Sequence, residues 1–280
     1  MNTETFAAWI GRRETVQDEL AAAQYRAAVA TFDDPKLTPS DAALLPPLWH
    51  WFYFLPTAPQ SQLSEDGHPQ RGGFMPPIPL PRRMFAGSRM TFHAPLRLAA
   101  SAIRDSVIRD VTIKRGKSGT LAFVTVSSTI TQDDVVCIEE EQDIVYREPG
   151  TAVVAPTPVP FDAAPPASWT RDVIPDPRLL FRFSALTFNA HRIHYDREYA
   201  MREEGYPGLV VHGPLNAVLL SNLVRAHTTR PIAQFAFRGM APVFDTAPYR
   251  LLARADGDHV QCEVLAANGT VALTATALLR

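Results

Sequence analysis

Alternation of apolar and polar residues is the clearest pattern in the chain, and it runs through residues 88–146. Val124 and Val126, for example, alternate with threonine and serine, as expected of a strand with one buried face. Turn-like sequences rich in glycine, lysine and aspartate interrupt the alternation twice. The pattern therefore predicts three long strands, near 96–114, 119–132 and 135–146.

Helical spacing of apolar residues occurs in two places. Residues 14–30 carry Leu20 and Ala23 on one face, which predicts a helix there. A second helix is predicted from Pro214 to about Ala226, where Val218 belongs to a mostly apolar face. Proline suits the start of this helix because the first helical position needs no amide donor.

Proline divides the chain. Residues 149–177 are rich in proline and alanine, and because proline fixes φ and lacks an amide donor, this stretch is expected to be an extended linker. It separates an N-terminal half, residues 1–148, from a C-terminal half, residues 178–280. Residues 46–54, rich in proline and aromatic side chains, are too broken for a long helix and are expected to cover a core from outside.

The two halves partly repeat each other. Residues 90–96, Met-Thr-Phe-His-Ala-Pro-Leu, are similar to residues 237–243, Phe-Arg-Gly-Met-Ala-Pro-Val. Further strands follow in both halves, at 119–131 and at 270–278. A helix wrapped by a long antiparallel sheet, formed twice, is an α+β fold of the double hot-dog type, and this is the fold that we predict.

Composition narrows the class of protein. The chain has 280 residues, of which 46% are hydrophobic, enough for one large domain or two modest ones. No apolar run is long enough to cross a bilayer, and the first residues lack the layout of a secretion signal. A formal net charge of −2 argues against broad binding to nucleic acid. Cys137 and Cys262 show no metal-ligand spacing, so we expect two small buried side chains and a cytoplasmic protein.

A polar cluster at residues 183–196, after a strand-like run, carries the candidate chemistry. The imidazole of His194 titrates near neutral pH, so it can take and return a proton. Asn189, five positions earlier, can hold a water molecule or a carbonyl through its carboxamide. Asp196 is expected to begin a short helix as its acidic cap. Arg192 is either a solvated or ion-paired arginine or a substrate contact.

The same cluster has a second interpretation. His191, His194 and Asp196 are of the residue types that bind zinc. No cysteine and no second pair of histidines stands near them in the sequence, so we predict no metal site.

The segment from His212 to Leu215 begins the second predicted helix. Backbone N–H groups at a helix start have no partner within the helix and lie at the positive end of its dipole. Gly213 has no side chain to block its amide, which could therefore receive a thioester oxygen as that oxygen becomes enolate-like.

Residues 183–196 and 210–215 resemble the hydratase motif of the MaoC-like hot-dog family. In that motif a polar residue is followed five positions later by a histidine, and a glycine opens the central helix some twenty residues further on. The family's catalytic pair is an aspartate and that histidine. Asn189 stands at the aspartate position and His194 at the histidine position. The sequences of these two segments and of parts of residues 65–95 are similar to one branch of the family, the mesaconyl-C4-CoA hydratases and type 2 3-hydroxyacyl-thioester dehydratases.

The resemblance implies reversible hydration of a 2-enoyl-CoA thioester, or dehydration of a 3-hydroxyacyl-CoA in the other direction. His194 would exchange the proton, Asn189 would position the water, and the amide of Gly213 would stabilise the enolate. The branch suggests a short, branched, dicarboxylic acyl group such as mesaconyl. No cofactor is expected, since coenzyme A is part of the substrate.

Further expectations concern the substrate and the assembly. Arg82, Arg83 and Arg89 could bind phosphate or a substrate carboxylate, because guanidinium binds both bidentately. Arg192 and His212 are further candidate contacts. The first half is expected to touch the substrate without catalysing, so that each chain has one active site. Because hot-dog sheets have edges that need covering, a homodimer is expected.

Two alternatives from other classes stay open. One is an inactive hot-dog protein that only binds acyl thioesters. The other is a metal-dependent thioesterase that uses His191, His194 and Asp196.

Overall fold

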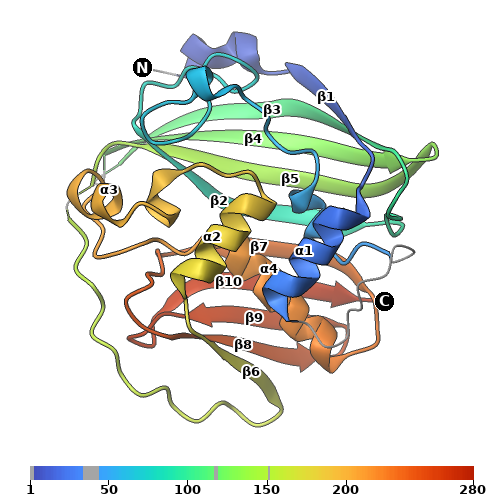
Figure 1. The fold of residues 1–280 in the computed structure, drawn as a ribbon, viewed down its shortest axis with the longest axis vertical. Coiled ribbons are helices and arrows are strands. Elements are labelled where there is room, and N and C mark those ends of the chain that lie inside the picture. The colour runs from blue at the N-terminus through green and yellow to red at the C-terminus, as the bar shows by residue number, and fades with distance from the viewer. Residues whose placement is uncertain (1–2, 34–43, 117–118, 151) are drawn as a thin grey trace.

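Ten antiparallel strands form one continuous sheet in the computed structural model, which describes residues 3–33, 44–116, 119–150 and 152–280. The order across the sheet is β1-β3-β4-β5-β2-β7-β10-β9-β8-β6. Figure 1 shows the strands of the first half in its upper part and those of the second half below them. The strands are β1 (Arg13–Asp18), β2 (Arg82–Phe92), β3 (Ala102–Gly116), β4 (Gly119–Gln132), β5 (Val135–Arg147), β6 (Ser168–Val173), β7 (Ile232–Gly239), β8 (Tyr249–Asp256), β9 (His259–Leu265) and β10 (Val271–Leu279).

The strand order confirms the predicted duplication. Read from either edge, each half contributes its first, third, fourth, fifth and second strand in that order. The halves meet where β2 pairs with β7, and Ser88 lies opposite Phe237 at this seam. Gly87 allows the close approach, because a Cβ atom there would lie 2.5 Å from the carbonyl oxygen of Phe237. The three strands predicted in the first half are present as β3, β4 and β5.

Of the two predicted helices, the second is confirmed and the first is partly wrong. Helix α4 (Gly213–His227) has its residues from Leu215 to Val224 buried against the sheet. Residues 14–18, expected to be helical, instead belong to edge strand β1, where exposed and half-buried side chains alternate and the backbone pairs with β3. Helix α1 (Ala22–Phe32) begins only afterwards and packs on α2 (Pro177–Leu186). The described part of the first half has no long buried helix like α4.

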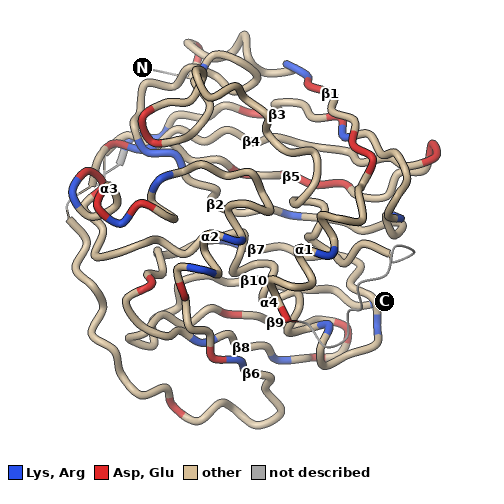
Figure 2. The backbone as a smooth tube through the Cα atoms, viewed as in Figure 1, with Lys and Arg blue, Asp and Glu red and all other residues tan. Residues whose placement is uncertain are grey.

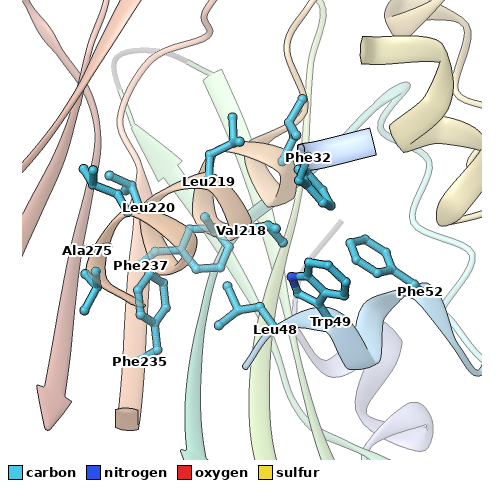
Figure 3. Close-up of a cluster of buried hydrophobic side chains, with 14 of the residues drawn as sticks. Phe32, Leu48, Trp49, Phe52, Val218, Leu219, Leu220, Phe235, Phe237 and Ala275 are labelled. Atoms are coloured by element: carbon cyan, nitrogen blue, oxygen red, sulfur yellow. The ribbon is translucent and has the colours of Figure 1, made fainter. Parts of the chain in front are cut away.

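Aromatic side chains from residues 48–54 lie inside the core, so the prediction that this segment covers a core from outside is wrong. Trp49 and Phe52 are almost completely buried, in a 3₁₀ turn (Trp49–Phe52). Trp49 contacts the ring of Phe32, and Figure 3 shows it on the same side of the cluster as Val218 of α4. The two halves therefore share one core.

The segment 149–177 is only partly a linker. Its last portion, Ser168–Val173, is the edge strand β6 and pairs with β8. No proline interrupts this stretch, so its amides are free to join the ladder. The strand-like run expected before Phe183 is also wrong, because Asp176 caps a helix there, α2, by accepting a hydrogen bond from the amide of Arg178.

Two remaining expectations concern the cysteines and the membrane. Cys137 and Cys262 are both buried and unpaired, as expected. Among the described residues, no helix is long and apolar enough to span a bilayer.

Candidate active site

The loop that follows α2 holds the candidate chemistry. It runs through Asn189 to a 3₁₀ turn (Arg192–His194) and ends at Asp196, whose carboxylate accepts a hydrogen bond from the amide of Tyr199. This carboxylate caps the short helix α3 (Arg197–Arg202), as predicted. Asp196 therefore serves the backbone of α3.

His194 is buried and has a fixed tautomer. Its Nδ1 donates a hydrogen bond of 2.7 Å to the carbonyl oxygen of Val210, which can only accept. The other ring nitrogen, Nε2, therefore carries a lone pair, and no described residue is bonded to it. Burial lowers the pKa of His194 to about 4, although the bond to Val210 acts in the opposite direction. The ring is a neutral base at physiological pH.

His212 joins His194 to the start of α4. The two rings are stacked with their centroids 3.6 Å apart, and His212 is the residue that precedes the helix. Its Nε2 lies 2.9 Å from the hydroxyl of Ser184 on α2, and burial holds its pKa well below the usual value. His212 is thus a neutral ring that orders the site.

A cavity of about 1430 Å³ connects these groups and is lined by both halves of the chain. His194, His212 and Gly213 all line it, and Gly213 is the first residue of α4. The structure therefore brings the predicted acid–base residue and the predicted anion-binding helix start to one cavity.

Asn189 also lines the cavity, but its oxygen is already engaged. Oδ1 accepts a hydrogen bond of 3.0 Å from the backbone N–H of His191. This bond closes an Asx-type turn that shapes the catalytic loop. The carboxamide nitrogen stays available as a donor and Oδ1 keeps a second lone pair, so the role of Asn189 in positioning the water stays a prediction.

The four predicted arginines have different surroundings. Arg89 is exposed, paired with Asp143 and outside the cavity lining, so substrate contact by it is not supported. Arg83 lines the cavity, is half-buried, and forms no hydrogen bond or ion pair with another described residue. Arg82, the preceding residue, is buried and forms an ion pair of 3.0 Å with Glu204. Neither of these two residues lines the cavity. Arg192 is bound to Asp196, also outside the lining, in a region around α3 where basic and acidic residues alternate (Figure 2). Substrate contact by Arg82 or Arg192 is therefore not supported.

The metal-ligand set considered from the sequence is wrong. The carboxylate of Asp196 is engaged by Arg192 and by the amide of Tyr199, and it does not line the cavity. A different set does converge in the described part of the chain: ligand atoms of Asp66, His68 and His191 lie within 4.8 Å of one another.

His68 and Glu140 of the first half line the cavity but carry no motif that singles them out in the sequence. His68 and its neighbour Asp66, which is not part of the lining, occur in the glycine–proline loop that precedes β2, where an Asp-Gly-His sequence was the only signal. Deeper in the first half, Glu140 is a fully buried carboxylate that receives hydrogen bonds from Trp51 and Ser88, and its Oε2 lies 3.1 Å from His50 Nε2. Burial raises the pKa of Glu140, but its hydrogen bonds, first of all with His50, outweigh burial and lower it overall.

Comparison with known proteins agrees with this geometry. The family model described as hydroxyacyl-thioester dehydratase type 2 matches residues 48–245. The chain belongs to this family. A mesaconyl-C(4)-CoA hydratase of Chloroflexus aurantiacus is 63% identical to it over 99% of this chain and 98% of the relative.

Solved structures share the fold of this type 2 dehydratase family member. A MaoC-like dehydratase superposes with a TM-score of 0.74 over 98% of both chains, at 14% identity. A Mycobacterium tuberculosis protein described as having a double hotdog fold superposes with a TM-score of 0.58 over 100% of this chain and 98% of its own, at 13% identity. The predicted double hot-dog fold and the predicted family are both confirmed.

Proposed function

We propose that this protein catalyses the reversible addition of water to the double bond of a 2-enoyl-CoA thioester. The observation that carries the proposal is the position of His194, a base with a free Nε2, in the same cavity as the first amide of α4. Family membership supports the same chemistry, since both the family model and the relative from Chloroflexus are named for hydration or dehydration of thioesters.

One base is sufficient for the reaction. In hydration, Nε2 of His194 takes a proton from water while the water oxygen bonds to C3. The electrons of the C2–C3 double bond then move toward the thioester oxygen, and the N–H of Gly213 stabilises the resulting enolate. The imidazolium of His194 finally returns the proton to C2. Dehydration follows the same steps in reverse.

A short, branched, dicarboxylic acyl group such as mesaconyl is the substrate that Arg83 favours. Its guanidinium lines the cavity and has no partner among the described residues. A partly buried charge is stabilised when an opposite charge pairs with it. Its positive charge contributes to the lowered pKa values of His68 and His191, so it lies close to the histidines. A free carboxylate on the acyl group would pair with Arg83 through two hydrogen bonds.

A panel of CoA thioesters tests the proposal. Purified protein without added metal is assayed by the enoyl absorbance with mesaconyl-C4-CoA and with linear enoyl-CoA of similar length. We expect turnover, with preference for the dicarboxylic substrate. No absorbance change with any thioester would favour the inactive binding protein, and chelator-sensitive release of free CoA would favour the thioesterase.

The same panel tests the preferred acyl group independently of the hydratase reaction. Arg83→Gln should raise KM for the dicarboxylic substrate roughly tenfold or more, the scale of a lost charged hydrogen bond, and leave the linear substrate unchanged. Arg89→Gln is the matched control, because Arg89 lies exposed on the same strand, paired with Asp143 and outside the cavity. An equal effect of Arg83→Gln on both substrates would assign Arg83 to coenzyme A instead.

Three expectations from the sequence stay predictions. The homodimer is checked by the mass of the protein in solution, and the cytoplasmic location by fractionation of the cells that make it. The absence of a cofactor is checked by full activity after dialysis against a chelator.

A further inference from the structure

A turn from the first half is fixed against the catalytic loop of the second half. The amide of Arg192 donates a hydrogen bond of 2.9 Å to the carbonyl oxygen of Asp66. Between Asp66 and His68, Gly67 has a φ of +90°, and a Cβ atom there would lie 1.8 Å from the carbonyl oxygen of Ala190. Only glycine fits this position, so the turn has a defined place beside the loop that carries His194.

Asp66 and His68 form an ordered carboxylate–imidazole pair within this turn. Nδ1 of His68 lies 3.0 Å from Oδ2 of Asp66, and the other carboxylate oxygen accepts a bond of 3.0 Å from the amide of His68. Since the carboxylate accepts, Nδ1 carries the hydrogen and Nε2 is left as an acceptor. The pair thus presents one acceptor nitrogen with a fixed tautomer.

His68 belongs to the same cluster of rings as His194. Its ring lies 4.1 Å from that of His191, which in turn meets His194 edge to face at 5.3 Å. His68 and His194 both line the cavity. Burial lowers the pKa of His68 despite the opposing effect of Asp66, so Nε2 stays unprotonated at neutral pH.

The reaction needs an acceptor of this kind. A water molecule that gives one hydrogen to His194 has a second hydrogen, and orienting it fixes the direction of the oxygen lone pair toward C3. Asn189 is another candidate, but its Oδ1 already accepts a hydrogen bond from the backbone of the loop that carries His194.

A divalent cation is a weaker explanation for the same three residues. Arg83 already places a positive charge close enough to lower the pKa of both His68 and His191. A cation between these rings would meet the same repulsion. The Asp66 carboxylate is also occupied on both oxygens by His68.

We propose that His68, oriented by Asp66, accepts the second hydrogen of the water that His194 deprotonates. The first half then contributes a catalytic residue, in contrast to its expected non-catalytic role, and Asp66 is a positioning residue. This inference rests on the proposed hydratase function and adds no proton transfer to it.

Two substitutions at His68 test the role. His68→Leu removes the acceptor and should lower kcat by roughly thirtyfold or more, while KM changes less than threefold, because only orientation of the water is lost. His68→Gln offers an amide oxygen as a replacement acceptor and should recover much of the loss. Asp66→Ala, which frees the tautomer of His68, should fall between the wild type and His68→Leu.

The matched control is His93→Leu. His93 also pairs with a carboxylate, that of Glu139 at 2.8 Å, but the pair is exposed and outside the cavity. Its removal should leave kcat and KM unchanged. Circular dichroism and thermal midpoints of all variants show whether each one is folded. If His68→Leu does not fold, His68→Gln is compared with the wild type in its place.

Each outcome decides between the explanations. If the wild type hydrates the thioesters but folded His68→Leu stays within threefold in kcat, or loses only in KM, the role in orienting water is wrong and the hydratase function stands. If a chelator abolishes wild-type activity and a divalent metal restores it, Asp66, His68 and His191 are a metal site and the inference falls. A wild type without hydratase activity would remove both proposals.

Discussion

His194 lies among other imidazoles and no carboxylate touches it. His212 stacks on one face, His191 meets it at an edge, and burial disfavours protonation of the ring. The neutral ring is a ready base, while the imidazolium that it forms is unstable in this setting. The unstable cation favours rapid return of the proton to C2, which suits a group that must both take and give the same proton.

Removal of this base should abolish most of the activity. We expect His194→Ala to lower kcat by about a hundredfold or more, the usual effect of losing a general acid–base group. His259→Ala is the control, since His259 is exposed at the start of β9. Steady-state kinetics check the prediction, and a kcat within tenfold of the wild type would contradict the assignment.

The low pKa of His194, about 4, predicts an activity that is insensitive to pH in the neutral range. Protonation of Nε2 removes the base, so kcat/KM for hydration should be level above about pH 5.5 and fall as the pH drops through about 4. His191 and His212 contact the ring and His68 contacts His191, and burial lowers the pKa of all three below the usual value. A pH–rate profile measured on the folded protein checks this; a fall centred near pH 6.5 would show that an unperturbed histidine controls the reaction.

At the scale of elements, two separate segments build the site: the loop between α2 and α3, and the turn at Gly67 that precedes β2. Neither segment is regular secondary structure, and each is held by backbone hydrogen bonds and close packing rather than by a ladder. The helix α4 is the rigid element, because its residues from Leu215 to Val224 are buried. The site therefore combines the start of one rigid helix with two loops that are held in place by packing and backbone hydrogen bonds.

A pair of glycine substitutions separates the packing of the turn from its backbone conformation. Gly67 and Gly11 both have φ near +90°, but a Cβ atom at Gly11 would meet nothing within 4 Å. Gly11→Ala should cost about 1 kcal/mol from φ alone, with activity unchanged. Gly67→Ala should cost roughly 1–3 kcal/mol more and lower kcat, because the turn must move away from Ala190.

Denaturant unfolding and steady-state kinetics measure both effects. Equal destabilisation by the two substitutions, with full activity in both, would show that the turn tolerates displacement and that its fit against the loop is unimportant.

At the scale of the whole molecule, the two hot-dog halves form one body. β2 and β7 pair across the seam, and Phe52 of the first half meets Phe183 of the second edge to face, with ring centroids 5.9 Å apart. Both halves also line the cavity. The site exists only when the halves are joined, so folding and activity should be lost together.

Trp49→Ala tests this shared core. The ring is fully buried and contacts Tyr25, Phe32 and Phe52, so its loss should lower the free energy of unfolding by about 3–5 kcal/mol. The variant should still unfold in one transition, seen alike by circular dichroism and fluorescence. Phe181→Ala, at a side chain that is 63% exposed, is the control for stability. Two separate transitions would show that the halves are independent.

Local patterns in the sequence determined several of the helices and strands and two residues of the site. The alternation in β3 to β5, the apolar face of α4 and the acidic cap of α3 each depend on residues close in the chain, so they could be predicted. His194 and Gly213 could be predicted for a similar reason, since both lie within twenty residues of one motif.

Tertiary structure alone decided which side chains meet. Whether residues 14–18 become helix or strand depends on the pairing partner β3, and whether Trp49 covers or fills the core depends on the space beside α4. The meeting of His68 with His191, and the hydrogen bond from the Arg192 guanidinium to the carbonyl oxygen of Glu65, depend on how a loop of one half packs on the other. Such contacts depend on how segments far apart in the chain come together, and spacing along the chain carries no record of them.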